Sequence, residues 1–182
     1  MTQTVLETPR LILRPFRESD AGDVYEYARD PRVGPIAGWL PHASVEESRE
    51  IIRTVFAHPG IFAMEQRQTG KVIGSVGFVG NHPAGECPDV PDDEVGYALS
   101  PTVWGQGLMP EAVRAVIAEC FGSQNYDFLT CGHFLRNHRS LRVIEKCGFS
   151  YWKDILFRTR MGTEEPVRLY LLKNTKKGDI HV

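Results

Sequence analysis

The residues from 104 to 112 read WGQGLMPEA, with two glycines, a proline and a glutamate where a helix is expected to begin. Gly105 and Gly107 lack a Cβ atom, so the backbone can approach a ligand closely and adopt positive φ angles. The first amides of a helix have no partner within it, and the aligned peptide dipoles place about half a positive charge there. The stretch therefore predicts a site for an anion such as a diphosphate, with Pro110 at the first helical position.

The same residues are also compatible with an unspecific tight turn, because glycine-containing turns are common. They lack the lysine followed by serine or threonine that a P-loop needs. They also lack the form GxGxxG after the first strand of a dinucleotide-binding fold. These absences argue against kinase and dehydrogenase functions, and the surrounding sequence must decide between an anion site and a simple turn.

Strand and helix signals surround the turn on both sides. The run at 94–99 predicts a strand that leads into it, and apolar residues at helical spacing predict a helix that ends near Gly122. Ser44 and Glu47 have the form of a capping box at the start of another helix. The other expected strands cover 11–16, 61–66, 72–79, 128–133, 149–157 and 167–172, and the other helices cover 20–29, 44–58 and 140–146.

This order of elements predicts an α+β (mixed α/β) fold. We expect one central, mixed and mostly antiparallel twisted sheet of about seven strands, flanked by about four helices. Residues 81–93 are rich in proline, glycine and aspartate and predict an exposed loop. A chain of 182 residues is expected to form one domain, residues 1–182, with a polar tail after Lys173.

Composition excludes several classes of function. The chain is 42% hydrophobic and 24% charged with a formal net charge of −2, which gives no bulk attraction to nucleic acid or membrane. Its apolar runs are far shorter than a membrane span, and residues 1–4 lack the features of a signal peptide, so we expect a cytoplasmic protein. No CxxC spacing joins the cysteines, and we expect buried thiols rather than disulfides or a metal site at Cys87, Cys120, Cys131 and Cys147.

Several segments together resemble the GNAT superfamily of acyl-CoA N-acyltransferases, and within it the ribosomal-protein N-terminal acetyltransferases of RimJ and RimL type. The segments are RLILR at 10–14, GYALSP at 96–101, WGQG at 104–107 with Glu111 and Ala112, Asn137 with Ser140, and EKCGF at 145–149. The family's loop is written Gln/Arg-x-x-Gly-x-Gly/Ala. Here Trp104 stands at its first position and Met109 at its last, and we expect Met109 to crowd the phosphates.

The resemblance implies an N-acetyltransferase that moves an acetyl group from acetyl-CoA, its co-substrate, to a primary amine by direct attack on the thioester. The turn would hold the CoA pyrophosphate, the preceding strand would pair with the pantetheine arm, and the next helix start would contact the arm and the thiol. These roles fall on Trp104, Gly105, Gln106, Gly107, Leu108 and Met109, on Ala98 and Leu99, and on Asn137 and Ser140. From their residue types alone, capping of the helix that follows is the favoured role of Asn137 and Ser140. The phosphate-type turn before them favours contacts to CoA instead, and the two roles can coexist.

Three residues are candidates for catalysis. The resemblance makes Glu94 the first choice for the general base, although a solvated glutamate at a strand start is an equally simple interpretation. It also makes Ser140 a hydrogen-bond donor to the leaving thiolate. His133 could act as an acid or a base because an unperturbed imidazole has a pKa near ~6.5, but a lone histidine is more often structural. An amide near Leu99 could stabilise the oxyanion.

The resemblance places Trp39, His42 and the loop 81–93 around the amine acceptor. The acceptor could be a protein N-terminal α-amino group or a small amine such as a polyamine, an antibiotic or an amino acid. We expect a monomer or a homodimer, without nucleic-acid or membrane partners. Two other functions stay open: an acyl-CoA-binding sensor that transfers nothing, and a nucleotide-binding enzyme.

Overall fold

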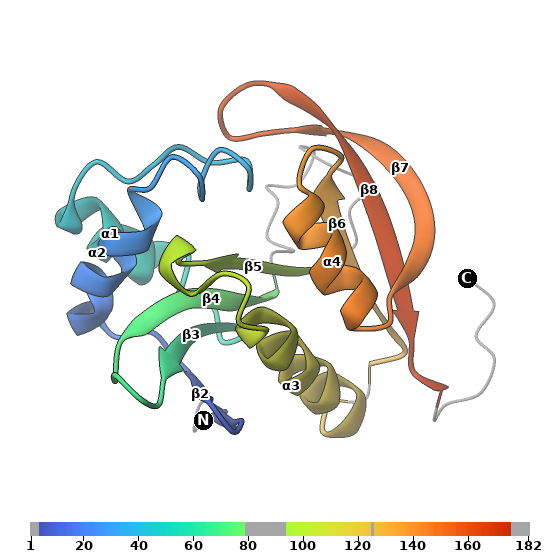
Figure 1. Cartoon of the computed structure of the whole chain (residues 1–182), viewed down its shortest axis with the longest axis horizontal. Coiled ribbons are helices and arrows are strands. Elements are labelled where there is room, and N and C mark those ends of the chain that lie inside the picture. Colours follow the sequence, from blue (N-terminus) through green and yellow to red (C-terminus); the bar gives the residue numbers. More distant parts are fainter. Residues whose placement is uncertain (1–3, 79–93, 125, 176–182) are drawn as a thin grey trace.

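The computed structural model of the chain describes residues 4–78, 94–124 and 126–175 (Figure 1). The strands are β1 (Leu6–Glu7), β2 (Leu11–Arg14), β3 (Ile61–Gln66), β4 (Val72–Phe78), β5 (Val95–Leu99), β6 (Phe128–Phe134), β7 (Ser150–Arg158) and β8 (Glu164–Lys173). The α-helices are α1 (Ala21–Ala28), α2 (Val45–Thr54), α3 (Leu108–Gly122) and α4 (His138–Lys146). Two short 3-10 helices, η1 (Glu18–Asp20) and η2 (Pro101–Val103), precede α1 and the glycine turn.

The strands form two antiparallel sheets. One has the order β1-β2-β3-β4-β5 and the other the order β6-β8-β7. The predicted class, a mixed α/β fold with mostly antiparallel strands and four helices, is confirmed, but the single sheet divides in two. An isolated parallel bridge between Glu94 and Thr130 joins β5 to β6. From there β6 forms its ladder with β8, so a gap is left between β5 and β6.

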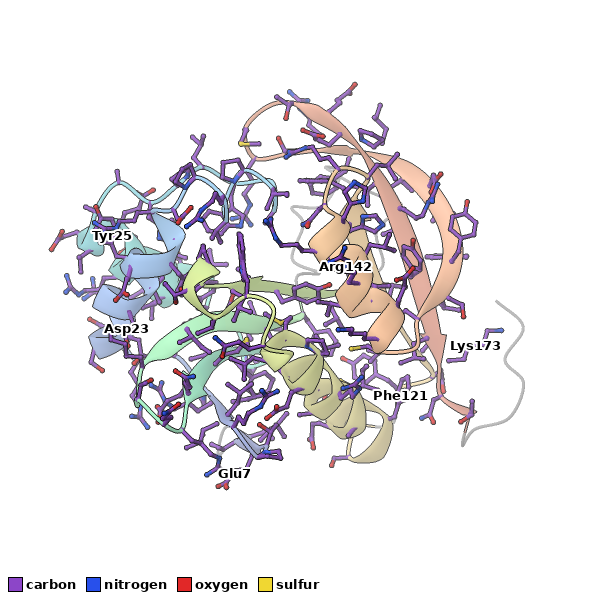
Figure 2. The ribbon with its side chains drawn as sticks, viewed as in Figure 1. Glu7, Asp23, Tyr25, Phe121, Arg142 and Lys173 are labelled. Atoms are coloured by element: carbon purple, nitrogen blue, oxygen red, sulfur yellow. The ribbon has the colours of Figure 1, made fainter. Side chains whose placement is uncertain are left out.

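The helices cover both faces of the five-stranded sheet. Val95 and Tyr97 of β5 belong to the apolar cluster under α3, whereas Ala98 packs against the cluster of α1. Because successive side chains of a strand point to opposite faces, α1 and α3 lie on opposite faces of this sheet. In Figure 2, Tyr25 on α1 lies at the left of the view and Phe121 on α3 at its lower right.

Local sequence signals explain most helix boundaries. Ser44 caps α2 as expected, with its Oγ accepting the amide of Glu47 at 3.1 Å. Asp20 precedes α1 but does not cap it, because its carboxylate is bound by the buried Arg14 guanidinium at 2.8 Å. Strand β1 was not expected, since Pro9 interrupts the apolar pattern that continues in β2.

Two further expectations concern cysteines and membranes. Cys120 and Cys131 are buried free thiols as expected, and Cys147 is a half-buried one. Cys87 and the predicted loop 81–93 lie outside the described residues. Among the helices that the structure describes, none has the length and apolar character needed to cross a membrane.

Candidate active site

The turn before α3 has the geometry of an anion site. Gly105 and Gly107 have φ angles of 80° and 75°, in the region that side chains disfavour, and both are exposed. Gly107 is the N-cap of α3, and no side chain caps this helix. The amides of Leu108 and Met109 therefore have no partner within the helix. The predicted boundary at Pro110 is wrong by two residues, because the helix already begins at Leu108 and Pro110 occupies its first turn.

Met109 does not crowd this turn. Its side chain is 4% exposed and belongs to the apolar cluster beneath α3. The expectation of crowding is wrong because the side chain points into the core while the amide stays at the helix start. The larger residue at the last motif position is therefore compatible with an anion at the turn.

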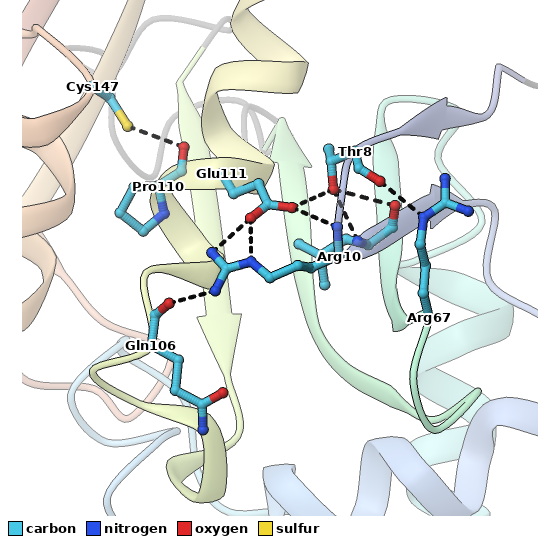
Figure 3. Close-up of polar contacts among 8 residues, drawn as sticks. Thr8, Arg10, Arg67, Gln106, Pro110, Glu111 and Cys147 are labelled. Atoms are coloured by element: carbon cyan, nitrogen blue, oxygen red, sulfur yellow. Dashed lines mark hydrogen bonds and ion pairs between the residues drawn. The ribbon is translucent and has the colours of Figure 1, made fainter.

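A polar network anchors the turn to the N-terminal strands (Figure 3). Arg10 donates from Nη1 to the Gln106 carbonyl at 2.8 Å and from Nε to Glu111 at 2.7 Å. Glu111 also accepts from the Thr8 hydroxyl at 2.6 Å and from the Arg10 amide at 2.9 Å. The segment between β1 and β2 thus fixes both the carbonyl of the turn and the first turn of α3.

The backbone of β5 offers hydrogen-bonding groups to the gap between the sheets. Ser100 donates its amide to the Ile73 carbonyl at 2.8 Å, and directions alternate along an antiparallel strand. The backbone of Ala98 therefore faces β4, and that of Leu99 faces the gap. The Leu99 carbonyl accepts the Trp104 indole N–H at 2.9 Å, while the Leu99 amide is directed toward the gap. Ala98, whose backbone faces β4, contributes its methyl group to the lining of the cavity described below.

The start of α4 lies across the gap from β5. Asn137 caps this helix, with Oδ1 accepting the Ser140 amide at 3.1 Å and Nδ2 donating to the Ile36 carbonyl at 3.3 Å. The capping interpretation of Asn137 is confirmed, but Ser140 is not a cap. Its hydroxyl lies 2.8 Å from the hydroxyl of Tyr97 on β5. This contact spans the gap just where the two sheets separate.

Glu94 lies on the other side of this opening. Its carboxylate accepts the amide of Gly132 on β6, and burial raises its pKa to about 7. A Cβ atom on Gly132 would lie 2.8 Å from Glu94 Oε1, so a glycine is needed at this position for the carboxylate to sit against β6. A carboxyl group that titrates near neutral pH is well suited to accept a proton.

His133 is directed away from Glu94. Gly132 faces Glu94, so the next residue of β6 points to the opposite face. The His133 Nδ1 lies 2.8 Å from the Phe134 carbonyl, and Nε2 lies 3.5 Å from the Tyr170 hydroxyl. Burial lowers the pKa of this imidazole. These contacts are typical of a structural histidine.

A cavity of about 680 Å³ runs between the sheets and beneath the segment that precedes α2. Many of its walls are apolar, including Phe56, Phe78 and Phe157. Seven of the candidate residues line it: Trp39, His42, Glu94, Ala98, His133, Asn137 and Ser140. Residues 104–109 are not part of this lining, so the glycine turn and the cavity are two separate parts of the candidate site.

The segment with Trp39 and His42 is held over the cavity by distant contacts. The His42 ring is buried, with Nδ1 2.8 Å from the Ser48 hydroxyl, and it packs against the Trp39 ring at 5.3 Å. Burial lowers the pKa of His42. Arg160 donates its amide to the Gly38 carbonyl at 3.1 Å, which ties the segment to the β7–β8 hairpin.

Two residues of the site were not predicted as functional. Tyr97 stands in the GYALSP segment, and its spacing of two from Val95 and Leu99 indicates the face it shares with them. The sequence therefore contained a signal that could have placed Tyr97 on this face. Gly132 gave none, because its need for a missing side chain comes from Glu94, which lies far away in the sequence.

Comparisons with known proteins agree with this fold. Residues 10–150 match the family described as the acetyltransferase (GNAT) domain. The chain is 29% identical over 150 residues to a Bacillus subtilis protein named the uncharacterized N-acetyltransferase YoaA, covering 80% of this chain and 82% of that one. A GNAT-family acetyltransferase structure from Bacillus anthracis superposes with a TM-score of 0.78 at 19% identity, covering 94% of this chain and 99% of that one. The ribosomal-protein-S5-alanine acetyltransferase of Vibrio fischeri gives a TM-score of 0.70 at 22% identity, with coverage of 94% and 97%.

Proposed function

Because the chain belongs to the acetyltransferase (GNAT) domain family, we propose that it acetylates a primary amine held in the cavity between its two sheets. The chain is an N-acetyltransferase, and GNAT domains use acetyl-CoA as co-substrate. The proposal that the amine reacts in this cavity rests on the opening between β5 and β6, which has Glu94 on one side and Ser140 on the other. Both side chains line the same cavity.

The glycine turn fits the diphosphate of acetyl-CoA. Its amides at the start of α3 lack a side-chain cap, and a Cβ atom built on Gly105 would meet no other atom within 4 Å. Open space beside unpaired amides at a helix N-terminus is what a diphosphate needs. Acetyl-CoA supplies the activated acetyl group as a thioester. In this proposal the gap-facing backbone of Leu99 and the start of α4 hold the pantetheine arm.

Glu94 removes a proton from the amine. A free α-amino group has a pKa near ~8, so much of it is protonated at neutral pH. Glu94 has a pKa of about 7 because it is buried, and its ionised form can take this proton. The amine then attacks the carbonyl carbon as a neutral nucleophile.

Leu99 and Ser140 stabilise the charges that form. The Leu99 amide, directed toward the gap, donates to the oxygen of the thioester carbonyl as it becomes negative. A well-placed donor of this kind is worth about 3 kcal/mol in other acyl-transfer enzymes. The Ser140 hydroxyl donates to the sulfur when the carbon–sulfur bond breaks.

The acceptor in this proposal is the α-amino group of a protein or peptide N-terminus. The Vibrio fischeri structure of similar fold is named for a ribosomal-protein alanine substrate, which motivates this choice. A cavity of about 680 Å³ lies within the range that encloses drug-sized ligands and has room for the first residues of a peptide. Apolar walls suit side chains better than they suit a polyamine.

The test is a panel of acceptors assayed for release of free CoA thiol from acetyl-CoA. Peptides with free N-termini should release CoA and gain an acetyl group at the α-amine, which mass spectrometry of fragment ions locates. The same peptides with formylated N-termini are the matched controls and should be inert. Turnover confined to polyamines, amino-sugar antibiotics or free amino acids would contradict the proposed acceptor.

A sensor function gives a different result in the same experiment. Calorimetric titration would then show binding of acetyl-CoA without release of CoA for any amine. That outcome would contradict the proposed use of Glu94 as a base. Stronger thermal stabilisation by ATP than by acetyl-CoA would argue against the diphosphate assignment to CoA.

A further inference from the structure

The hydroxyl of Tyr97 crosses from β5 to α4 and meets Ser140. Its oxygen lies 2.8 Å from Ser140 Oγ and 3.2 Å from the Ser140 carbonyl. A phenol is a stronger hydrogen-bond donor than an aliphatic hydroxyl, and Ser140 Oγ is the nearer of the two acceptors. The shorter contact is therefore the natural place for the single phenolic hydrogen.

A third group sets the direction of this contact. The buried thiol of Cys131 on β6 lies 4.0 Å from the Tyr97 oxygen, within the reach of a weak sulfur donor. Burial raises the pKa of the Cys131 thiol, so it keeps its hydrogen. A donor at the Tyr97 oxygen favours the arrangement in which Tyr97 in turn donates to Ser140. The hydrogen of Ser140 is then free to point elsewhere.

We propose that Tyr97 is a positioning residue, which donates to Ser140 Oγ and so directs the Ser140 hydroxyl hydrogen to the sulfur of the leaving CoA. This inference rests on the proposed function of Ser140. The donors run in one direction, from Cys131 to Tyr97 to Ser140, and each hydrogen bond polarises the next. Without Tyr97, Ser140 can turn its hydrogen toward another acceptor.

Tyr97 and Ser140 stabilise charge without giving up their protons. Burial raises the pKa of Tyr97 well above its ordinary value, which makes the phenol a poor acid but leaves it a good donor. When the carbon–sulfur bond breaks, its electron pair stays on the sulfur, and the hydrogen bond from Ser140 lowers the energy of the resulting thiolate. The thiolate takes its final proton from solvent.

The decisive variant is Tyr97→Phe, which removes one hydroxyl and keeps the ring. We expect kcat to fall about ten-fold, as for the loss of one hydrogen bond near charge, with little change in the KM for acetyl-CoA. Ser140→Ala should show the same pattern. Tyr25→Phe is the matched control, because this exposed hydroxyl only approaches the Ala43 carbonyl at 3.5 Å, and its kinetics should equal those of the wild type.

Binding supplies a readout that a merely structural role would not change. The thiolate absorbs in the ultraviolet, so titration of bound CoA gives the pKa of its thiol. We expect this pKa to be about one unit higher in Tyr97→Phe than in the wild type, since one unit corresponds to a ten-fold change. The affinity for desulfo-CoA, which lacks the sulfur, should be the same in both proteins.

The possible outcomes distinguish the positioning role of Tyr97 from a structural role and from failure of the proposed function. An unchanged thiol pKa in Tyr97→Phe, together with a changed one in Ser140→Ala, would overturn the role of Tyr97 and leave the proposed function standing. Equal loss of affinity for CoA and desulfo-CoA would show a structural role and overturn the inference. Failure of the wild-type protein to release CoA with any amine would instead contradict the proposed function, while the thiol pKa would still report on Tyr97.

Discussion

The glycine turn and the acceptor cavity differ in how their geometry is encoded. The turn is built from consecutive residues, and the amides that we propose bind the diphosphate follow Gly107 at the start of α3. The cavity is lined by residues from the segment before α2, from β5, from β6 and from the β7–β8 hairpin. A local pattern therefore identifies the proposed CoA-binding part of the site, whereas long-range contacts shape the part that we propose holds the amine.

The largest expected effect lies in the cavity, at Glu94. Replacing it in Glu94→Gln keeps the shape and removes the base, so kcat should fall at least about 100-fold, as for the loss of a general base. The affinity for acetyl-CoA should change little, because the turn is untouched. Steady-state kinetics and calorimetry measure the two quantities. Normal turnover with full occupancy would remove Glu94 from the mechanism.

The second effect lies in the turn, at Gly107. In Gly107→Val a branched side chain must adopt a φ of 75°, which costs about 1–3 kcal/mol locally and displaces the amides from the diphosphate. We expect the affinity for acetyl-CoA to fall by about ten-fold or more. Gly70→Val is a matched control, since Gly70 has a φ of 69° in the β3–β4 turn and belongs to neither the glycine turn nor the cavity lining. Equal affinities in the two variants would contradict the diphosphate assignment.

A smaller effect is expected at Arg10, which acts on the turn from outside. Arg10→Met removes the contacts to the Gln106 carbonyl and to Glu111 but leaves the α3 amides in place. Because Arg10 is about half exposed, at 49%, we expect a rise of only a few-fold in the KM for acetyl-CoA. Arg67→Met breaks the pair with Glu7 and the bond to the Thr8 carbonyl but no contact to Gln106 or Glu111, so it should leave this KM unchanged. A KM for Arg10→Met equal to that of the wild type would show that the turn holds its shape alone.

More of the turn than of the cavity could be predicted from the sequence. Gly107, Asn137 and the capping of α2 follow from local residue types, and each is found where it was expected. The boundary at Pro110 was misplaced because proline is tolerated throughout a first helical turn, not only at its first position. Met109 was misjudged because a motif gives its position along the chain but not the direction of its side chain.

The division into two sheets and the surroundings of Glu94 depend on residues distant in sequence. β6 pairs with β8 rather than extending the ladder of β5, and no periodicity of β6 itself reports this choice. The pKa of Glu94 depends on burial and on the backbone amide of Gly132, which the carboxylate can approach because Gly132 has no side chain. His133 has the residue type of a catalytic base, yet the alternation of β6 turns it away from Glu94. Such features come from packing.

The most direct test of the account is the pH dependence of kcat/KM for a peptide amine, compared between the wild type and Glu94→Gln. This parameter reports ionisations of the free enzyme and the free amine. Because ionised Glu94, with a pKa of about 7, takes its proton from an amine with a pKa near ~8, log kcat/KM of the wild type should fall below pH 7 and again above about pH 8, each time with a slope of about one. The residual activity of Glu94→Gln should depend on amine that is already neutral, so it should rise up to about pH 8 and stay level above it. Profiles of the same shape in the two proteins, without the fall of the wild type above about pH 8, would contradict the assignment of Glu94 as the base.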